Sequence, residues 1–353
     1  MTLPTEPIGS IPRPVELMNG MAAFGAGRIG KDALEALFDG AVRDTIRRFE
    51  ETGSPVITDG EQRKPSFATY PIHGLAHLGP GGVTIPFQDG HERQLPVLTA
   101  GPFRYATFAA EYLEGAKKYT KTPLKQAVIA PSALSLLYPQ AAIPGYSRDA
   151  FLADLAREAE TDIRRCLAAG ASVQLDFTEG RLCIKLDPSK GLLDAFVDLN
   201  NRVLDGFTAD ERRHIGVHTC PGGDQDSTHS ADVDYAELLP ALFRLKVGNF
   251  FVQLASEADR PRVLKILGAH AKDGRRVFVG VTDPINPRIE TAEQVRDHIL
   301  EAARFIDPAH LGTTDDCGFS PFGDDASTSR DTAFAKIRAR VEGNAMASRE
   351  LGV

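Results

Sequence analysis

The sequence predicts an α/β fold, specifically a (β/α)8 or TIM barrel with a small β-hairpin insertion. Short apolar and β-branched runs alternate with segments of helical periodicity, the pattern of a parallel sheet with right-handed crossovers. About eight of these runs qualify as strands, the number that closes such a barrel. Several runs end at an acidic or metal-binding side chain, and the carboxyl ends of barrel strands are where such folds place their chemistry.

The predicted elements follow one another in a regular order. Strands are expected within residues 8–11, 55–61, 126–132, 172–176, 214–218, 250–255, 276–281 and 311–314. Helices are expected up to about residue 53 and at residues 148–169, 191–207, 235–244, 260–272, 292–305 and from 331 onward. The helix at 148–169 has the clearest signals, since Ser147 can cap its start and Gly170 can end it.

Residues 74–105 have a different texture, rich in glycine and proline. Two apolar runs flank the pair Asp89-Gly90, which favours a tight turn between antiparallel strands. We therefore expect a β-hairpin inserted into one catalytic barrel that occupies residues 1–353.

Composition excludes several classes of protein. The chain has 353 residues and a net charge of −8, without a block of basic residues, so a nucleic-acid partner is not expected. It has no apolar run long enough to span a membrane and no signal-like N-terminus, which predicts a cytoplasmic protein. In a reducing compartment its 4 cysteines indicate metal or thiol chemistry rather than a disulfide framework.

Three predicted strand ends carry residues that bind metals. His218 and Cys220 close one strand, and Glu257 and Cys317 follow two later strands. An imidazole, two thiolates and a carboxylate suit a tetrahedral zinc site. The alternative is a packed cysteine beside a structural histidine, since buried free cysteine is common in protein cores. The two remote residues favour the metal.

Further carboxylates at predicted strand ends indicate an acidic opening of the barrel at that end. Each carboxylate alone is more typical of a solvated rim residue or of a helix cap. These carboxylates are Glu61, Asp176, Asp283 and Asp316. The sequence has no G-x-G-x-x-G phosphate loop and no G-x-S-x-G nucleophile elbow.

The chain resembles the catalytic barrel of cobalamin-independent methionine synthases, a family that includes the zinc-dependent epoxyalkane–coenzyme M transferases. Ile8-Gly9-Ser10-Ile11-Pro12 is similar to the family's I-G-S-F-P opening, and Val173-Gln174-Leu175-Asp176 to its I-Q-I-D strand. Asp59-Gly60-Glu61 is loosely similar to its H-G-E segment. The segments His218-x-Cys220, Glu257-x-x-Arg260 and Asp316-Cys317-Gly318 resemble its zinc-ligand segments, in the same order.

The resemblance implies specific roles. It implies that Zn²⁺ is held by His218, Cys220, Glu257 and Cys317. It also implies that homocysteine is bound through its amino-acid part by the Ile8-Gly9-Ser10 backbone and by the carboxylates of Glu61 and Asp176. Zinc would convert the substrate thiol, which is mostly protonated at neutral pH, into a nucleophilic thiolate.

The sequence departs from the family pattern at the position assigned to proton delivery. The family's D-x-H-S-P-R reads Asp283-Pro284-Ile285-Asn286-Pro287-Arg288, so Ile285 replaces the histidine. Asp283, His229 or Glu61 is a candidate to substitute, or else the donor needs less acid assistance. The acid after Asp176 is displaced to Glu179, and the resemblance covers the catalytic barrel alone, so we expect no counterpart of the second barrel of full-length methionine synthases.

We therefore expect an enzyme of methionine biosynthesis that transfers a methyl or other alkyl group to a thiol, most simply homocysteine, with zinc as cofactor. Its partners would be a small-molecule thiol and an alkyl donor, with a homo-oligomer or a methyl-donor protein left open. The alternatives are alkyl transfer to another thiol, such as epoxide opening by coenzyme M, and a non-catalytic zinc-binding barrel. The ordered ligand set disfavours the zinc-free uroporphyrinogen decarboxylases, which share the barrel.

Overall fold

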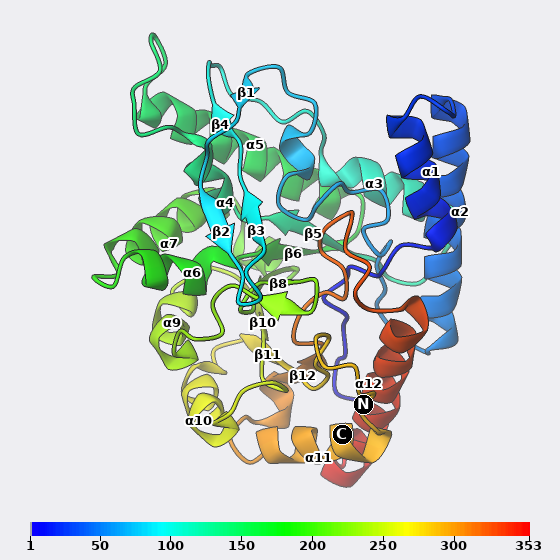
Figure 1. The fold of residues 1–353 in the computed structure, drawn as a ribbon. Helices are drawn as coiled ribbons and strands as arrows, with labels where there is room; N and C mark the ends of the chain where they lie inside the picture. Colours follow the sequence, from blue (N-terminus) through cyan, green and yellow to red (C-terminus); the bar gives the residue numbers. More distant parts are fainter. Residues whose placement is uncertain (1) are drawn as a thin grey trace.

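The computed structural model describes residues 2–353 and is built around a parallel sheet (Figure 1). The sheet has six strands in the order β12-β11-β10-β7-β6-β5, and every neighbouring pair is parallel. The strands are β5 (Lys125–Ile129), β6 (Ser172–Asp176), β7 (Ile215–Thr219), β10 (Asn249–Val252), β11 (Arg276–Gly280) and β12 (Leu311–Thr314). They correspond to the last six predicted strands.

Two irregular segments complete the (β/α)8 barrel in place of the first two predicted strands. Thr5 forms a parallel bridge to Thr313 on β12, and Ile57 forms one to Leu124 beside β5. The two segments join each other where the Ile11 amide donates to the Gly60 carbonyl at 3.0 Å. The first strand, predicted at residues 8–11, is thus only a bridge at Thr5. Prolines at positions 4, 7 and 12 remove the amide donors that a longer ladder needs.

Helices surround the sheet. They are α1 (Val15–Gly25), α2 (Lys31–Glu51), α3 (Ala109–Ala116), α4 (Pro131–Leu134), α5 (Arg148–Ala168), α6 (Glu179–Leu186), α7 (Gly191–Leu204), α8 (Ala209–Arg212), α9 (Tyr235–Leu242), α10 (Arg260–His270), α11 (Ala292–Ala302) and α12 (Arg330–Leu351). Single 3-10 turns lie at Tyr70–Ile72, Ser135–Leu137 and Pro308–His310. Over residues 2–353, no helix combines the length and apolar character that crossing a bilayer requires.

The end signals predicted for α5 are confirmed. The Ser147 side chain accepts a hydrogen bond from the Ala150 amide, and Gly170 has a φ of +83° just after the helix. The helices α3, α4, α6 and α8 were not predicted. With 4 residues each, α4 and α8 are too short to show an apolar period.

The predicted hairpin is also present. Strands β2 (Thr84–Pro86) and β3 (Glu92–Gln94) pair antiparallel, and β1 (Leu78–Gly79) pairs with β4 (Val97–Leu98) at its base. Its tip reaches a second small hairpin, β8 (Gly223–Asp224) and β9 (Ser227–Thr228), as Figure 1 shows. There the Gln88 amide donates to the Thr228 carbonyl at 3.0 Å.

A buried ion pair joins α12 to the end of β12 where the barrel closes. The Arg340 guanidinium is fully buried, and its Nε donates to Asp315 Oδ1 at 3.0 Å. Its Nη1 also donates to the Thr5 hydroxyl, so one side chain joins the last helix, the last strand and the N-terminal bridge.

We predict that Arg340→Met lowers the free energy of unfolding by about 3–5 kcal/mol, because it leaves the Asp315 carboxylate buried without its cation. Urea unfolding followed by circular dichroism measures the change. Arg338→Met is the matched control, since Arg338 is exposed on the same helix, and a surface change should stay within about 0.5 kcal/mol. Equal losses in both variants would contradict a special role for the buried pair.

Candidate metal centre

Three of the predicted metal ligands converge at the carboxyl-end rim of the barrel. His218 lies on β7, Cys220 follows that strand and Cys317 follows β12. One ligand atom from each side chain lies within 4.8 Å of the other two, and all three residues are buried. The two sulfur atoms are 3.1 Å apart. Two thiols and an imidazole in such a group suit zinc by ligand type.

The surroundings of the three side chains favour a bound cation. His218 Nδ1 lies 3.1 Å from Asp176 Oδ1, which also accepts a hydrogen bond from Gln174 Nε2 at 2.8 Å. A carboxylate on one ring nitrogen orients the imidazole and leaves the other nitrogen for a metal. The contact with the Cys220 thiol, together with burial, raises the pKa of Cys317 well above its usual range. A divalent cation would supply the charge that two thiolates at this position need.

Glu257, the fourth predicted ligand, does not belong to this group. The group whose ligand atoms lie within 4.8 Å of one another contains His218, Cys220 and Cys317 alone among the described residues. The Glu257 carboxylate instead forms an ion pair with the Arg181 guanidinium, at 3.1 Å between Oε1 and Nη1. Its ligation of a metal stays a prediction.

A cavity of about 590 Å³ lies beside the candidate metal centre. Its lining includes six of the residues singled out in the sequence, which are Ile8, Ser10, Glu61, Asp176, His218 and Cys317. Apolar side chains form much of the remaining wall, among them Met18, Met21, Phe67, Phe87 and Phe322. Residues more than 300 positions apart in the chain thus line one cavity.

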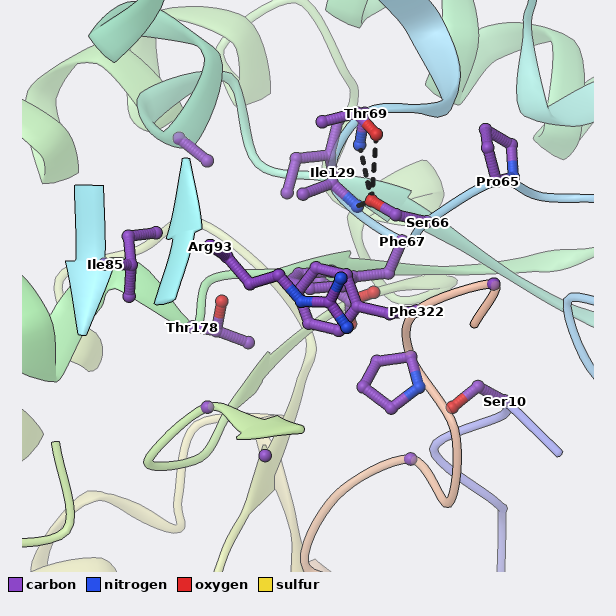
Figure 2. A pocket seen from close by; sticks show the side chains of 18 of the residues that line it. Ser10, Pro65, Ser66, Phe67, Thr69, Ile85, Arg93, Ile129, Thr178 and Phe322 are labelled. Atoms are coloured by element: carbon purple, nitrogen blue, oxygen red, sulfur yellow. Dashed lines mark hydrogen bonds between the residues drawn. The ribbon is translucent and has the colours of Figure 1, made fainter. Parts of the chain in front are cut away.

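The inserted hairpin forms one wall of this cavity, as Figure 2 shows with Ile85 and Arg93. The Arg93 guanidinium lies 4.3 Å from the Phe322 ring centroid. It is paired with Asp224 at 2.6 Å and with Asp324 at 2.9 Å. The charge of Arg93 is therefore matched by protein carboxylates.

The opening segment lies directly beside the loop that carries Cys317. The Ser10 hydroxyl accepts a hydrogen bond from the Ser320 amide at 3.2 Å, and a side chain on Gly318 would come within 2.1 Å of that hydroxyl. Gly9 has a φ of +144°, and its carbonyl accepts from the Thr58 hydroxyl at 2.7 Å. The Ile8 carbonyl accepts from Gln174 Nε2 at 3.2 Å. These contacts hold the turn against the cavity.

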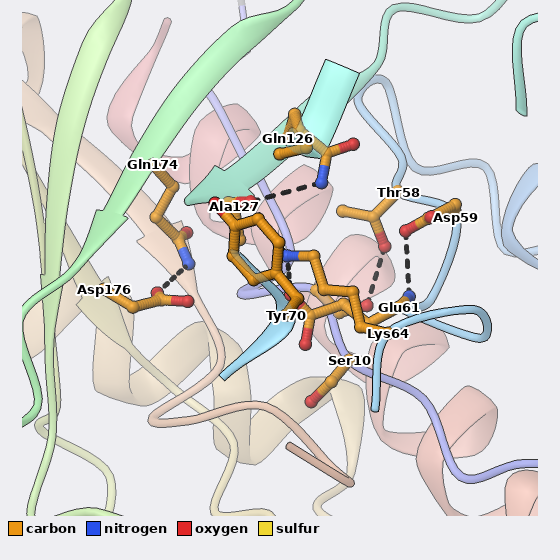
Figure 3. Close-up of polar contacts among 12 residues, drawn as sticks. Ser10, Thr58, Asp59, Glu61, Lys64, Tyr70, Gln126, Ala127, Gln174 and Asp176 are labelled. Carbon is orange, nitrogen blue, oxygen red and sulfur yellow. Dashed lines mark hydrogen bonds and ion pairs between the residues drawn. The ribbon is translucent and has the colours of Figure 1, made fainter. Parts of the chain in front are cut away.

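Glu61 has a partner that the sequence analysis missed. The backbone of Glu61 lies in the left-handed region, at φ 56°. The Asp59 carboxylate accepts a hydrogen bond from the Glu61 amide at 2.8 Å. The Lys64 ammonium donates to Glu61 Oε1 at 2.8 Å, in a pair that is fully buried (Figure 3). Burial opposes the charge of Lys64, but Glu61 outweighs it and raises the pKa of Lys64 to about 12. The only sequence signal was the three-residue spacing of the two side chains.

The position of the family's proton-delivering histidine is apolar and borders the metal centre. A side chain on Gly223 would meet Ile285 Cδ1 and the Cys317 sulfur, each at 3.7 Å. Asp283 is not among the residues that line the cavity, and its carboxylate accepts the Ile285 amide at 3.1 Å. His229 does line the cavity, and burial lowers its pKa to about 4, so its imidazole is neutral.

Asp316 holds the loop that leads to Glu257. Its Oδ1 accepts the amides of Leu254 and Ala255, and its Oδ2 accepts the amide of Ser256, each at 2.8 Å. The Ser256 hydroxyl donates to the same Oδ2 at 2.7 Å. Asp316, which directly precedes Cys317, thereby connects the loop after β10 to the loop that carries this cysteine.

Fold and site together define a barrel enzyme whose thiol–imidazole centre opens onto a substrate-sized cavity. Residues 3–341 match the family described as "Cobalamin-independent synthase, Catalytic domain", and the chain belongs to that family. The resemblance seen in the sequence is thereby confirmed.

Curated relatives agree with this assignment, and solved structures share the fold. Methionine synthases of Sulfurisphaera tokodaii and Saccharolobus solfataricus are each 25% identical to this chain, over 350 and 355 residues, and both alignments cover 99% of it. They cover 94% and 96% of those relatives. The fold is similar to that of a B12-independent methionine synthase from Shewanella sp. W3-18-1 in complex with selenomethionine, with a TM-score of 0.78 and 21% identity over 99% of both chains. A putative vitamin-B12 independent methionine synthase from Listeria monocytogenes gives a TM-score of 0.71, with 21% identity over 98% of both chains.

The cavity contains one further buried acid, Glu179, the displaced acid of the sequence analysis. Its Oε1 accepts a hydrogen bond from the Ser132 hydroxyl, and its Oε2 has no hydrogen-bond partner. Burial, aided by the charge of Asp176, raises the pKa of Glu179 to about 8 despite the hydrogen bond from Ser132.

We predict that Glu179→Gln flattens the pH dependence of stability. The pKa of a glutamate in the unfolded chain is about 4.3. Between that pH and about 8, the native protein therefore retains a proton that the unfolded chain has released. The wild-type free energy of unfolding therefore falls as pH rises through this window, with Glu179 contributing about 2–3 kcal/mol over two pH units. Glutamine has no proton to release, so the variant lacks this part of the decline.

Urea unfolding at about pH 5.5 and about pH 7.5 measures the difference. The control is Glu114→Gln at an exposed position of α3, which should follow the wild type. A Glu179→Gln variant with the wild-type pH dependence would contradict the raised pKa.

Proposed function

We propose that this protein is a zinc-dependent methyltransferase that methylates the thiol of homocysteine to form methionine. The observation that supports it most is the convergence of His218, Cys220 and Cys317 beside a cavity that is lined by His218, Cys317, Asp176 and Ser10. The family and its relatives named methionine synthase support the same reaction.

Zinc would be held by His218, Cys220 and Cys317, with Glu257 as the predicted fourth ligand. When bound, it would lower the pKa of the substrate thiol so that a thiolate forms at neutral pH. Asp176 would act on both the metal ligand and the substrate, because it orients His218 and also lines the cavity in which homocysteine would bind.

The amino-acid part of homocysteine would lie between the opening turn and the two acids. Asp176 is available to an ammonium group, whereas Glu61 already has the Lys64 ammonium as a partner. Backbone groups of Ile8, Gly9 and Ser10 would bind the remaining polar atoms. A charged hydrogen bond in this buried region is stronger than one in water.

The chemistry of the wall bears on the methyl donor. Ile285 cannot give a proton to a leaving group, and His229, which burial keeps neutral, has no proton to give at neutral pH. A donor whose leaving group needs no proton, such as a methyl-corrinoid, suits this wall better than a methyl-folate.

Two other functions fit this site less well. Epoxide opening by coenzyme M needs no ammonium site, so the buried carboxylate of Asp176 at the cavity favours homocysteine. A non-catalytic zinc barrel needs no cavity beside the metal, and about 590 Å³ of space there favours an enzyme.

We predict that the zinc-loaded protein forms methionine from homocysteine and a methyl donor, and that Cys220→Ser and Cys317→Ser each lose zinc and activity together. Metal analysis after dialysis and an assay of methionine formation measure both. Cys166→Ser is the control, because Cys166 is buried in α5 and belongs to no metal group. Stoichiometric zinc in both serine variants, or equal activity with a thiol that has no amino group, would contradict the proposal.

A further inference from the structure

The charged side chains around the cavity leave it with an excess of negative charge. Of the lysines and arginines in residues 2–353, Arg93 alone lines the cavity. Its guanidinium already has two carboxylate partners, Asp224 at 2.6 Å and Asp324 at 2.9 Å. No lysine or arginine of the wall is therefore free to hold an anionic group of a bound molecule. The carboxylates that line the cavity are those of Glu61, Asp176, Glu179 and Asp324.

Two of these four carboxylates lack a compensating cation. Asp324 is paired with Arg93, and Glu61 with the Lys64 ammonium at 2.8 Å. In the described part of the chain, the other two form no ion pair with a lysine or an arginine. One of them, that of Asp176, would receive the ammonium of homocysteine under the proposed function. The carboxyl group of Glu179 is the one that remains.

Glu179 is buried without a charge to balance it. It is only 5% exposed, and its Oε2 has no hydrogen-bond partner within residues 2–353. Burial raises its pKa to about 8, so at neutral pH this carboxyl group keeps its proton instead of remaining an anion. A cation bound in the cavity would stabilise the ionised form and would be attracted by it.

The same carboxyl group is poorly placed to act as an acid on a bound molecule. Protein atoms cover its Oε2, and its Oε1 accepts a hydrogen bond from the Ser132 hydroxyl. A general acid has to come within hydrogen-bond distance of the atom that it protonates. The electrostatic attraction of a charge needs no such contact and weakens gradually with distance. Glu179 therefore acts on a ligand through its charge.

The aromatic part of the wall also suits a weakly hydrated cation. Phe67 and Phe322 line the cavity with their ring centroids 5.5 Å apart, and Phe87 lines it as well. Figure 2 shows Arg93 beside these first two rings, and its guanidinium lies 4.3 Å from the Phe322 centroid. Aromatic faces attract cations, including those whose charge is surrounded by methyl groups. The wall thus favours a methylated cation twice, by charge and by ring contacts.

We propose that the methyl donor of this enzyme is a small methylsulfonium, a cation that the unpaired carboxyl group of Glu179 and the aromatic wall select. The inference rests on the proposed function, because it takes homocysteine as the methyl acceptor. The sulfur of the homocysteine thiolate forms a bond to the methyl carbon. The bond between that carbon and the sulfonium sulfur breaks, and its electron pair stays on that sulfur. The donor leaves as a neutral thioether, and no proton is transferred.

Other classes of donor fit this wall less well. Methyl-folates are anionic, and so is coenzyme M in the alternative reaction, whereas the wall has no free lysine or arginine for an anion. The leaving nitrogen of a methyl-folate also needs a proton. A quaternary ammonium has the right charge, but a thioether is a much weaker base than an amine and so leaves more readily. A cavity of about 590 Å³ has room for a small donor beside homocysteine, and a corrinoid is far larger than that.

Methionine formation from homocysteine by the zinc-loaded protein tests the class of donor. Trimethylsulfonium, a methyl-corrinoid and a methyl-folate are compared at equal concentrations, and dimethyl sulfide is measured as the second product of the sulfonium. Turnover with trimethylsulfonium should exceed turnover with each of the other two by about 10-fold or more.

Glu179→Gln separates the charge of this residue from its packing. Glutamine has the same shape and can accept the hydrogen bond from Ser132, but it cannot become an anion. The KM for trimethylsulfonium should rise by about 10-fold, while the KM for homocysteine stays as in the wild type. Glu114→Gln, at an exposed position of α3, is the matched control and should leave both values unchanged.

Calorimetric titration of the zinc-loaded protein compares trimethylsulfonium with dimethyl sulfide, its neutral counterpart with one methyl group fewer. The wild type should bind the cation more tightly than the sulfide. Glu179→Gln should weaken binding of the cation alone, since a change in packing would weaken both. Equal affinity for the two molecules in the wild type, or equal losses in the variant, would contradict the role of Glu179.

The donor assay distinguishes a failure of this inference from a failure of the proposed function. Methionine formed with the methyl-corrinoid or the methyl-folate, but not with the sulfonium, overturns the inference and leaves the proposed function intact. No methionine with any of the three donors contradicts the proposed function. In that case the titration still decides whether the cavity selects a methylated cation, because binding requires no turnover.

Discussion

Two buried thiols, 3.1 Å apart, set the central constraint of this structure. Both can become thiolates only if a cation shares the site, because two like charges cannot be buried side by side without one. The imidazole of His218, on the strand β7 that leads to Cys220, completes the group and is oriented by Asp176. A metal therefore accounts for the chemistry of the rim more simply than any proton-transfer role for these cysteines.

Barrel closure is what brings the three side chains together. In the sheet, two other strands lie between β7, which carries His218, and β12, which precedes Cys317, so the curvature of the barrel has to bridge that separation. The N-terminal segment completes the ring through Thr5 and then places Ser10 against Gly318. The contacts that stabilise the fold at this end are thus the same contacts that form the cavity wall. Stability and site geometry are coupled at the rim.

Much of this was predictable because strand ends are encoded locally. An apolar run that stops at His218, or before Cys317, identifies a rim residue without knowledge of its neighbours. The pairing of buried charges is not encoded locally. Glu257 pairs with Arg181, which lies 76 positions away in the chain, and no sequence periodicity indicates that contact. The first two strands were overestimated for a different reason, since their apolar character suggested ladders that the nearby prolines prevent. The sequence therefore identified the residue types that gather at the rim, whereas the contact between Glu257 and Arg181 could not be predicted from it.

X-ray absorption at the zinc edge counts the sulfur atoms bound to the metal and so tests whether this rim holds zinc and presents it to a thiol. We predict two sulfurs, from Cys220 and Cys317, in the zinc form without substrate, at about 2.3 Å. We predict three after homocysteine is added, with no sulfur gained when methionine is added instead. A sulfur count that homocysteine leaves at two, or a zinc bound without sulfur, would contradict a thiolate-held zinc that binds the substrate thiol.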